Sequence, residues 1–199
     1  MVTLNVSWNI ETVITLSLIF ISLIGSYLII RLDWKKYGLL YLIVAIIGNI
    51  LCYLFVSFGF YSFPYRLFPN TFIMPVTSVS TIIPFYVLIG VRYSPKLWVY
   101  KIIFYMGFVH LGMLAETIAR LNTSLIKYNF AWDTWDSYTW WWIFLLIFEY
   151  VGGLIINEEL RKPISSTAFN YGKWAFFFFH FIVITTIFLA GYYLGYISR

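Results

Sequence analysis

The sequence predicts an all-α, polytopic membrane protein with six transmembrane helices in a single domain, residues 1–199, and with both termini outside. The prediction rests on composition and on six long apolar segments. Of the 199 residues, 62% are hydrophobic and 11% are charged, and the mean hydropathy is +0.85, whereas a soluble domain carries about 25% charged residues. So little polar surface cannot cover a soluble globule, which excludes a water-soluble enzyme, a nucleic-acid-binding domain and a disordered chain.

Six segments are long and apolar enough to cross a hydrocarbon core, which takes about 20 residues. The first lacks the basic start and the small-residue cleavage site of a signal peptide, so we predict a permanent helix there. No connection is long enough to form a separate soluble domain. The predicted spans are Thr12–Ile30, Tyr37–Phe58, Thr71–Val91, Leu97–Ala119, Thr139–Asn157 and Trp174–Tyr196.

The basic residues predict the orientation, because cytoplasmic connections carry an excess of Lys and Arg. Nine of the 13 basic residues follow spans one, three and five, and four lie on the opposite face. This asymmetry predicts a multi-pass protein of the cell membrane with three short cytoplasmic loops and extracellular N- and C-termini. The nine are Arg31, Lys35, Lys36, Arg92, Lys96, Lys101, Arg161, Lys162 and Lys173, and the four are Arg66, Arg120, Lys127 and Arg199.

The third span contains two prolines, Pro75 and Pro84. Each removes a backbone donor and clashes with the preceding turn, which predicts a kinked or broken helix. Broken helices line binding cavities in transporters, although proline is also frequent in ordinary transmembrane helices.

Ionisable side chains inside the spans are the first candidates for function, because each costs about 2.5–3.5 kcal/mol to insert unless it faces a cavity or a partner. His110 and Glu149 each lie near the middle of a span, and we expect them to meet there and share one proton. Without such a contact Glu149 is an unpaired carboxylate, which makes it the best functional candidate. For His110 the structural alternative is a hydrogen bond between its ring and a backbone carbonyl. Glu116 lies on another face of the fourth span, where Arg120, four residues later, can pair with it as a structural pair or an ion clamp.

An aromatic segment, residues 128–142, joins spans four and five on the predicted outer side and holds five of the nine tryptophans. Tryptophan favours the membrane interface, so an interfacial belt is the structural interpretation. The functional interpretation is an aromatic lid or cage in which Asp133 and Asp136 attract a cationic or hydroxylated ligand. A second outer loop, residues 61–70, is also aromatic and carries Arg66.

Several short segments occur in a characteristic order: Trp34-Lys35-Lys36-Tyr37, Leu67-Phe68-Pro69-Asn70, Glu116, Tyr128, Trp132, Trp135, Ser137 and Arg161-Lys162-Pro163. Over residues 30–165 this order resembles a functionally uncharacterised family of small multi-pass membrane proteins of spore-forming Firmicutes. The resemblance implies a bacterial plasma membrane, marks Glu116, Tyr128 and Trp132 as matching positions, and implies no activity. Thr71 departs from the family pattern, which has a histidine there.

These observations favour a non-enzymatic protein that binds a small solute or a lipid headgroup from the outside, as a transport or sensing component. The predicted outer site consists of Arg66, Glu116, Arg120, Tyr128, Trp132 and Asp133, and His110 and Glu149 form its inner polar floor. Two alternatives stay open. One is a membrane-embedded enzyme acting on a lipid or isoprenoid, with Glu149 and His110 as an acid–base pair. The other is a structural or partner-binding membrane subunit.

We predict no cofactor and no metal site. The single cysteine, Cys52, excludes a disulfide framework and a multi-cysteine metal site, and the two histidines lie on different spans. The expected partners are membrane lipid, a small-molecule ligand and a partner membrane protein, and no nucleic acid.

Overall fold

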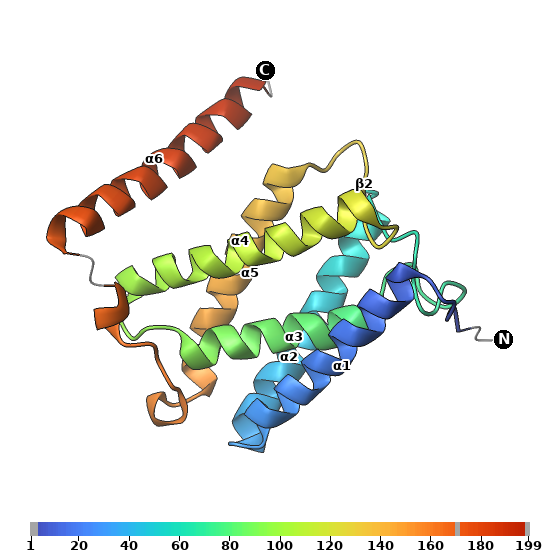
Figure 1. Cartoon of the computed structure of the whole chain (residues 1–199), viewed down its shortest axis with the longest axis horizontal. Coiled ribbons are helices and arrows are strands. Elements are labelled where there is room, and N and C mark those ends of the chain that lie inside the picture. Colours follow the sequence, from blue (N-terminus) through green and yellow to red (C-terminus); the bar gives the residue numbers. More distant parts are fainter. Residues whose placement is uncertain (1–3, 170–171, 198–199) are drawn as a thin grey trace.

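The structure, a computed structural model, describes residues 4–169 and 172–197 and consists of helices with one short two-stranded sheet (Figure 1). In chain order its elements are α1 (Ile10–Ile30), α2 (Trp34–Ser57), β1 (Tyr61–Ser62), α3 (Val76–Tyr93), α4 (Trp98–Asn122), β2 (Lys127–Tyr128), α5 (Thr134–Ile155), two short 3₁₀ helices (Glu158–Leu160 and Ser166–Phe169) and α6 (Lys173–Ile197).

Five helices of the described chain, α1 to α5, are long and apolar enough to cross a membrane, and they coincide with the first five predicted spans. The all-helical prediction and the multi-pass character are therefore supported by the fold. Helix α6 covers the sixth predicted span, and its described residues include a shorter apolar stretch, Phe179–Phe188. It lies to one side of the other five helices (Figure 1).

Local capping chemistry moves two helix starts away from the predicted limits. Helix α3 begins five residues later than predicted, because Pro75 lies directly before the first helical residue, where a missing N–H costs nothing. It then continues through Pro84 to its end, so the third span is not broken. Helix α5 begins five residues earlier, because the side chains of Asp133 and Asp136 form a capping box with each other's backbone N–H groups.

Helix α1 buries most of its serine and threonine side chains and exposes most of its apolar ones, which is the reverse of a helix in a soluble protein. Thr12, Thr15, Ser22 and Ser26 are buried, whereas most of its large apolar side chains are exposed. This face packs mainly against α3 rather than against α2, its neighbour in sequence. A Cβ atom at Gly25 would clash with the ring of Phe85, so α1 and α3 are in contact through a glycine. Small and hydroxyl residues at a helix contact, with apolar residues outside, are typical of helices in lipid.

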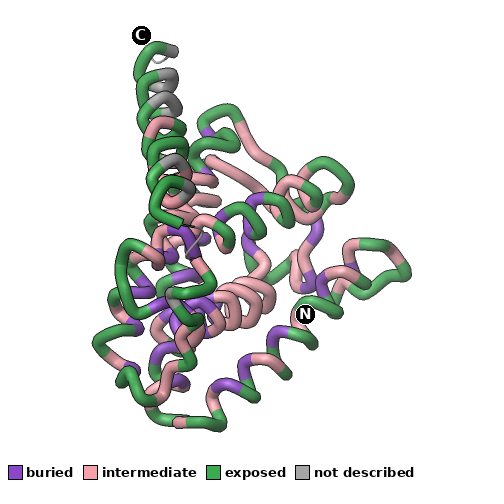
Figure 2. Tube along the Cα trace, turned by 60° about the vertical axis from the view of Figure 1, so that its left-hand side comes forward, coloured by how far each residue is buried: buried purple, intermediate pink, exposed green. Residues whose placement is uncertain are grey.

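Helix α3 occupies the centre of the bundle and contacts α1, α2 and α5, while α4 packs on α5. The buried positions follow this centre, and the exposed ones lie on the outer helix faces (Figure 2). The fully buried core side chains are Tyr37, Leu40, Val44, Val87, Leu88, Val91, Tyr105, Val109, Leu145, Phe148 and Ile156.

Strands β1 and β2 join the loop after α2 to the loop after α4, and we call this part of the bundle the strand end. The strands are antiparallel, with Tyr61 opposite Tyr128. The N-terminal segment is tied to the same end, because Asn5 N donates to the Leu67 carbonyl at 2.8 Å and Glu11 Oε1 accepts from Ser124 N at 3.0 Å. Both predicted outer loops therefore lie together, beside the start of α1.

Candidate functional site

The Glu116 carboxylate, near the end of α4, is the centre of a hydrogen-bonded cluster at the strand end. Its Oε1 accepts from Ser137 Oγ at 2.7 Å and from the Tyr128 hydroxyl, and its Oε2 accepts from Trp141 Nε1 at 2.8 Å. Trp132 Nε1 donates to Ser137 Oγ at 2.8 Å. We call these five residues the Glu116 cluster. Each group that donates to the carboxylate is electrically neutral.

Three separate elements bring the donors to Glu116. Pairing of β1 with β2 places Tyr128 beside the end of α4. The capping box fixes the start of α5, so that Ser137 and Trp141, four residues apart, project from the same side of that helix. Trp132 lies in the turn before the helix and is buried. The aromatic segment is thus folded around a carboxylate and does more than form an interfacial belt.

A cavity of about 290 Å³ adjoins the Glu116 cluster. Its size is near the lower limit of small-molecule sites in proteins, and its walls are mainly apolar, as is usual for such sites. The walls come from α2, α3, α4, α5 and the two loops of the strand end. The lining residues are Gly48, Leu51, Cys52, Phe55, Tyr61, Phe63, Pro75, Ser78, Val79, Ile82, Ile83, Glu116, Ile126, Trp132, Ser137, Trp140, Trp141 and Phe144.

Aromatic rings in mutual contact form the wall near the cluster. The ring centroid of Phe55 lies 5.1 Å from that of Trp132 and 4.8 Å from that of Trp140. Tyr61 meets Trp132 edge-on at 5.4 Å. Because each ring is held by another ring, this part of the wall is already formed in the chain without a ligand.

Two tyrosines of the strand end, Tyr61 and Tyr128, are held in their neutral form. Burial raises the pKa of the Tyr128 phenol well above its ordinary value, and the adjacent Glu116 carboxylate, which accepts its hydrogen bond, raises it further. Burial also raises the pKa of Tyr61, with a further contribution from the neighbouring Cys52 thiol. The hydroxyl of Tyr128 therefore remains a donor to Glu116 throughout the physiological pH range.

This raised pKa predicts a loss of stability at alkaline pH. In the unfolded chain the Tyr128 phenol ionises near pH 10, at about its ordinary value, so its contribution to stability is complete below that pH. The contribution is lost as the pH rises toward the higher folded-state pKa, with a slope of at most about 1.4 kcal/mol per pH unit. Unfolding in detergent micelles between about pH 8 and pH 11 should show a weaker pH dependence for Tyr128→Phe than for the wild-type chain. Equal pH dependence in the two proteins would contradict the assignment of this loss of stability to Tyr128.

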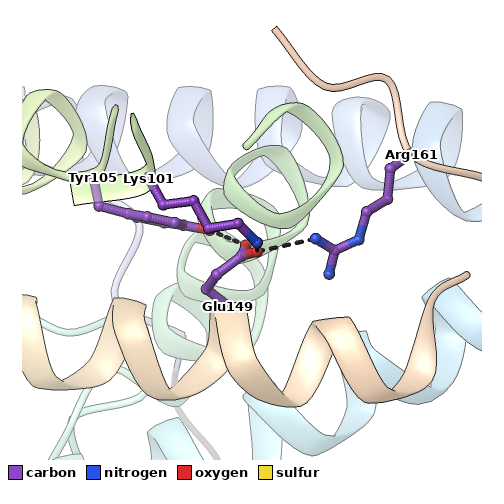
Figure 3. A network of polar contacts seen from close by, with 4 residues as sticks. All are labelled: Lys101, Tyr105, Glu149 and Arg161. Carbon is purple, nitrogen blue, oxygen red and sulfur yellow. Dashed lines mark hydrogen bonds and ion pairs between the residues drawn. The ribbon is translucent and has the colours of Figure 1, made fainter. Parts of the chain in front are cut away.

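Glu149 belongs to a second buried network (Figure 3), which joins the last turns of α5 to the first turns of α4 and to the segment after α5. Its Oε1 accepts from Lys101 Nζ and from Arg161 Nη1 at 3.0 Å, and its Oε2 accepts from the Tyr105 hydroxyl at 2.7 Å. The carboxylate is fully buried. Glu149 is therefore a completely paired carboxylate in a structural network, and the interpretation as an unpaired one is wrong.

The predicted contact between His110 and Glu149 is also wrong. His110 is exposed, its Nδ1 lies 2.7 Å from the Met106 carbonyl oxygen, and its ring lies against Tyr138 at 5.7 Å. It borders a second cavity, of about 450 Å³, that Thr117 of α4, Thr134 of α5 and Thr186 of α6 also line. His110 therefore has the structural alternative that the sequence left open, a hydrogen bond to a backbone carbonyl.

Three other predicted site residues lie at the strand end without lining the cavity. The guanidinium carbon of Arg120 lies 4.6 Å from the ring centroid of Tyr128, and among the described residues Arg120 forms no ion pair with Glu116. Asp133 caps α5 and, like Asp136, is engaged with the backbone instead of facing a ligand. Arg66 donates to the carbonyls of Phe63 and, at 3.5 Å, Pro69, which fixes its own loop.

Of the predicted site residues, Glu116 and Trp132 line the cavity and Tyr128 contacts both Glu116 and its neighbour Ser137. Sequence reasoning did not select the α5 positions that line it beside them. Ser137, Trp140, Trp141 and Phe144 share one helix face at spacings of three, four and seven residues, and that periodicity was the available signal.

Within the described residues, no group of three or more His, Cys, Asp or Glu side chains could hold a metal ion.

The fold and the site together define a multi-pass helical membrane protein with an aromatic-walled cavity and a hydrogen-bonded carboxylate at one end of its bundle. Comparison with known proteins adds no family to this description. No protein-family model, no curated protein and no solved structure gives a significant match to the chain.

Proposed function

We propose that this protein binds a small, mainly apolar molecule in the cavity beside Glu116, as the binding component of a transport or sensing system. The observation that carries the proposal is the combination of a cavity of about 290 Å³ with apolar walls and a single hydrogen-bonded carboxylate. Such a site combines apolar area for affinity with one polar anchor for orientation. The Glu116 cluster is that anchor.

The proposal includes the membrane setting of the site. Six spans, with α6 as the sixth and both termini outside, would put the strand end on the outer face of a bacterial plasma membrane. The distribution of basic residues supports this orientation, and the N-terminal segment lies at the strand end. A solute or lipid headgroup would then reach the cavity from the outside.

The structure favours binding over catalysis. An acid–base pair of Glu149 and His110 is not available, because Glu149 is engaged with Lys101, Arg161 and Tyr105 and His110 lies on an exposed helix face. The Glu116 carboxylate holds three donors, which suits a fixed anchor more than a group that exchanges protons.

Filling the cavity tests the proposal. Gly48 lines the cavity, and a Cβ there would meet its nearest neighbour, Val79, at an ordinary 3.6 Å. A Gly48→Phe side chain is therefore expected to occupy the cavity and exclude a ligand. Native mass spectrometry of gently solubilised protein should find a small-molecule adduct on the wild-type chain and a loss of at least about 90% of it in Gly48→Phe.

Gly107→Phe is the matched control, because Gly107 lies on α4 with no atom within 4 Å of a Cβ added there. It should keep the adduct. Retention of the adduct by a folded Gly48→Phe would contradict the assignment to this cavity. A co-purified protein in place of a small molecule would favour the partner-binding subunit.

A further inference from the structure

We propose that the ligand of this cavity is an organic monocation, an amine or quaternary ammonium compound with an apolar body. The inference rests on the proposed function and adds the chemical class of the ligand. It is argued from the charge of the cavity, the hydrogen-bonding capacity of Glu116 and the arrangement of the rings.

The cavity has one charge in its wall. Among its lining residues, all of which the structure describes, Glu116 alone is charged. The ion pairs found in the described part of the chain join Glu149 and Glu158 to basic residues and leave Glu116 without a cationic partner. Arg120 could supply one from the next turn, but its guanidinium lies over the ring of Tyr128.

Neutral donors do not compensate the charge of a carboxylate, and Glu116 is partly buried, where a charge is costly unless a cation lies beside it. Glu116 also has acceptor capacity to spare. Its Oε1 holds two hydrogen bonds and its Oε2 only one, whereas a carboxylate offers about four acceptor positions. A ligand N–H or an ammonium group that approaches Oε2 would supply both the missing contact and the missing charge.

The walls next to Glu116 are suited to a cation as well. The faces of Trp and Tyr rings attract ammonium groups, and Trp132, Trp140 and Tyr61 all line the cavity. The remaining wall is mainly apolar and has no basic side chain, so an anion or a free zwitterion would bury a negative charge without a partner. One positive charge at one end of an apolar body fits this distribution.

Two probes of equal shape separate charge from size. Benzyltrimethylammonium is the cationic probe, and neopentylbenzene is its neutral carbon analogue. Binding is measured by equilibrium dialysis against the full chain in phosphatidylglycerol nanodiscs, with empty nanodiscs as the blank. The wild-type chain should bind the cation at least about tenfold more tightly than the neutral probe, and Glu116→Gln, which keeps the shape of the side chain, should abolish that preference.

A second variant pair protects the test against a general effect on folding. Trp140→Leu removes an aromatic face from the cavity wall and should weaken cation binding about threefold to thirtyfold. Trp135→Leu changes an exposed tryptophan that does not line this cavity and should leave binding unchanged. Loss of binding in both variants alike would overturn the inference.

The outcomes distinguish this inference from the function on which it rests. Equal binding of both probes, blocked by Gly48→Phe, would overturn the monocation and leave the cavity as a binding site. Binding of neither probe would overturn both. Cation selectivity that persists in Glu116→Gln would overturn the role of Glu116.

Added phosphatidylcholine distinguishes the two sources of such a cation. Competition with the cationic probe would identify a lipid headgroup, and no competition would identify a free solute. Both of these last results support the monocation.

Discussion

Glu149→Gln is expected to destabilise the protein by about 3–5 kcal/mol, because it removes the one negative charge that compensates two buried cations. Lys101 and Arg161 both direct their charges to Glu149, and the side chains of all three are at least nine-tenths buried. Glutamine keeps the shape of the side chain and its contact with Tyr105 but leaves both cations uncompensated. Unfolding of the protein in mixed micelles, with a denaturing detergent as the variable, measures the effect.

Glu158→Gln is the control for this experiment. Glu158 also pairs with a lysine, Lys96, at 3.6 Å, but both side chains are largely exposed, and exposed pairs contribute little to stability. Its unfolding curve should overlay that of the wild-type chain. Equal stability of Glu149→Gln and Glu158→Gln would show that the buried network does not hold the bundle together.

Gly152→Ala is expected to produce the second large effect, through the contact between α5 and α3. A Cβ at Gly152 would lie 2.6 Å and 2.7 Å from the two γ-carbons of Val91, and Val91 is completely buried, with a branched side chain that cannot move aside. The helices must separate, which costs about 1–3 kcal/mol or more. Thermal unfolding in detergent should show the loss.

The adjacent glycine gives a matched control on the same helix. At Gly153 an added Cβ would have its nearest neighbour, the Nη2 atom of Arg161, at 3.5 Å, which is an ordinary contact. Gly153→Ala should therefore be neutral or slightly stabilising, since alanine favours helix by up to about 1 kcal/mol over glycine. A similar loss in both variants would show that the result reflects helix propensity and not helix contact.

The sequence predicted the five bundle helices because hydropathy over a long window requires no knowledge of tertiary contacts. Its errors at the starts of α3 and α5 arose where short-range chemistry, a proline and a capping box, decides the helix limit.

The prediction that Glu149 meets His110 failed for a different reason. Depth along a helix can be estimated from residue number, but rotation about the helix axis and the reach of a long side chain cannot. The sequence places Lys101 among the flanking charges, yet its side chain extends to Glu149.

The Glu116 cluster was predictable only in part. The density of aromatic residues pointed to the segment that contains Trp132, and an ionisable residue inside a span pointed to Glu116. The pairing of β1 with β2, which positions Tyr128, joins residues 67 positions apart in the chain, and no local pattern encodes it. The capping role of Asp133 is local and could have been recognised, because Asp133 and Asp136 have the spacing of a capping box.

The arrangement of α1 has a consequence for how the chain is assembled during its synthesis. The hydroxyl face of α1 is covered mainly by α3, and Glu11, in the first turn of α1, accepts a hydrogen bond from a residue as distant as Ser124. When α1 and α2 have entered the membrane, that polar face still lacks its partner, so the first two helices do not form a finished hairpin. The N-terminal region can reach its final place only after the first four helices have emerged from the ribosome, and assembly of the strand end is therefore a late event in biogenesis.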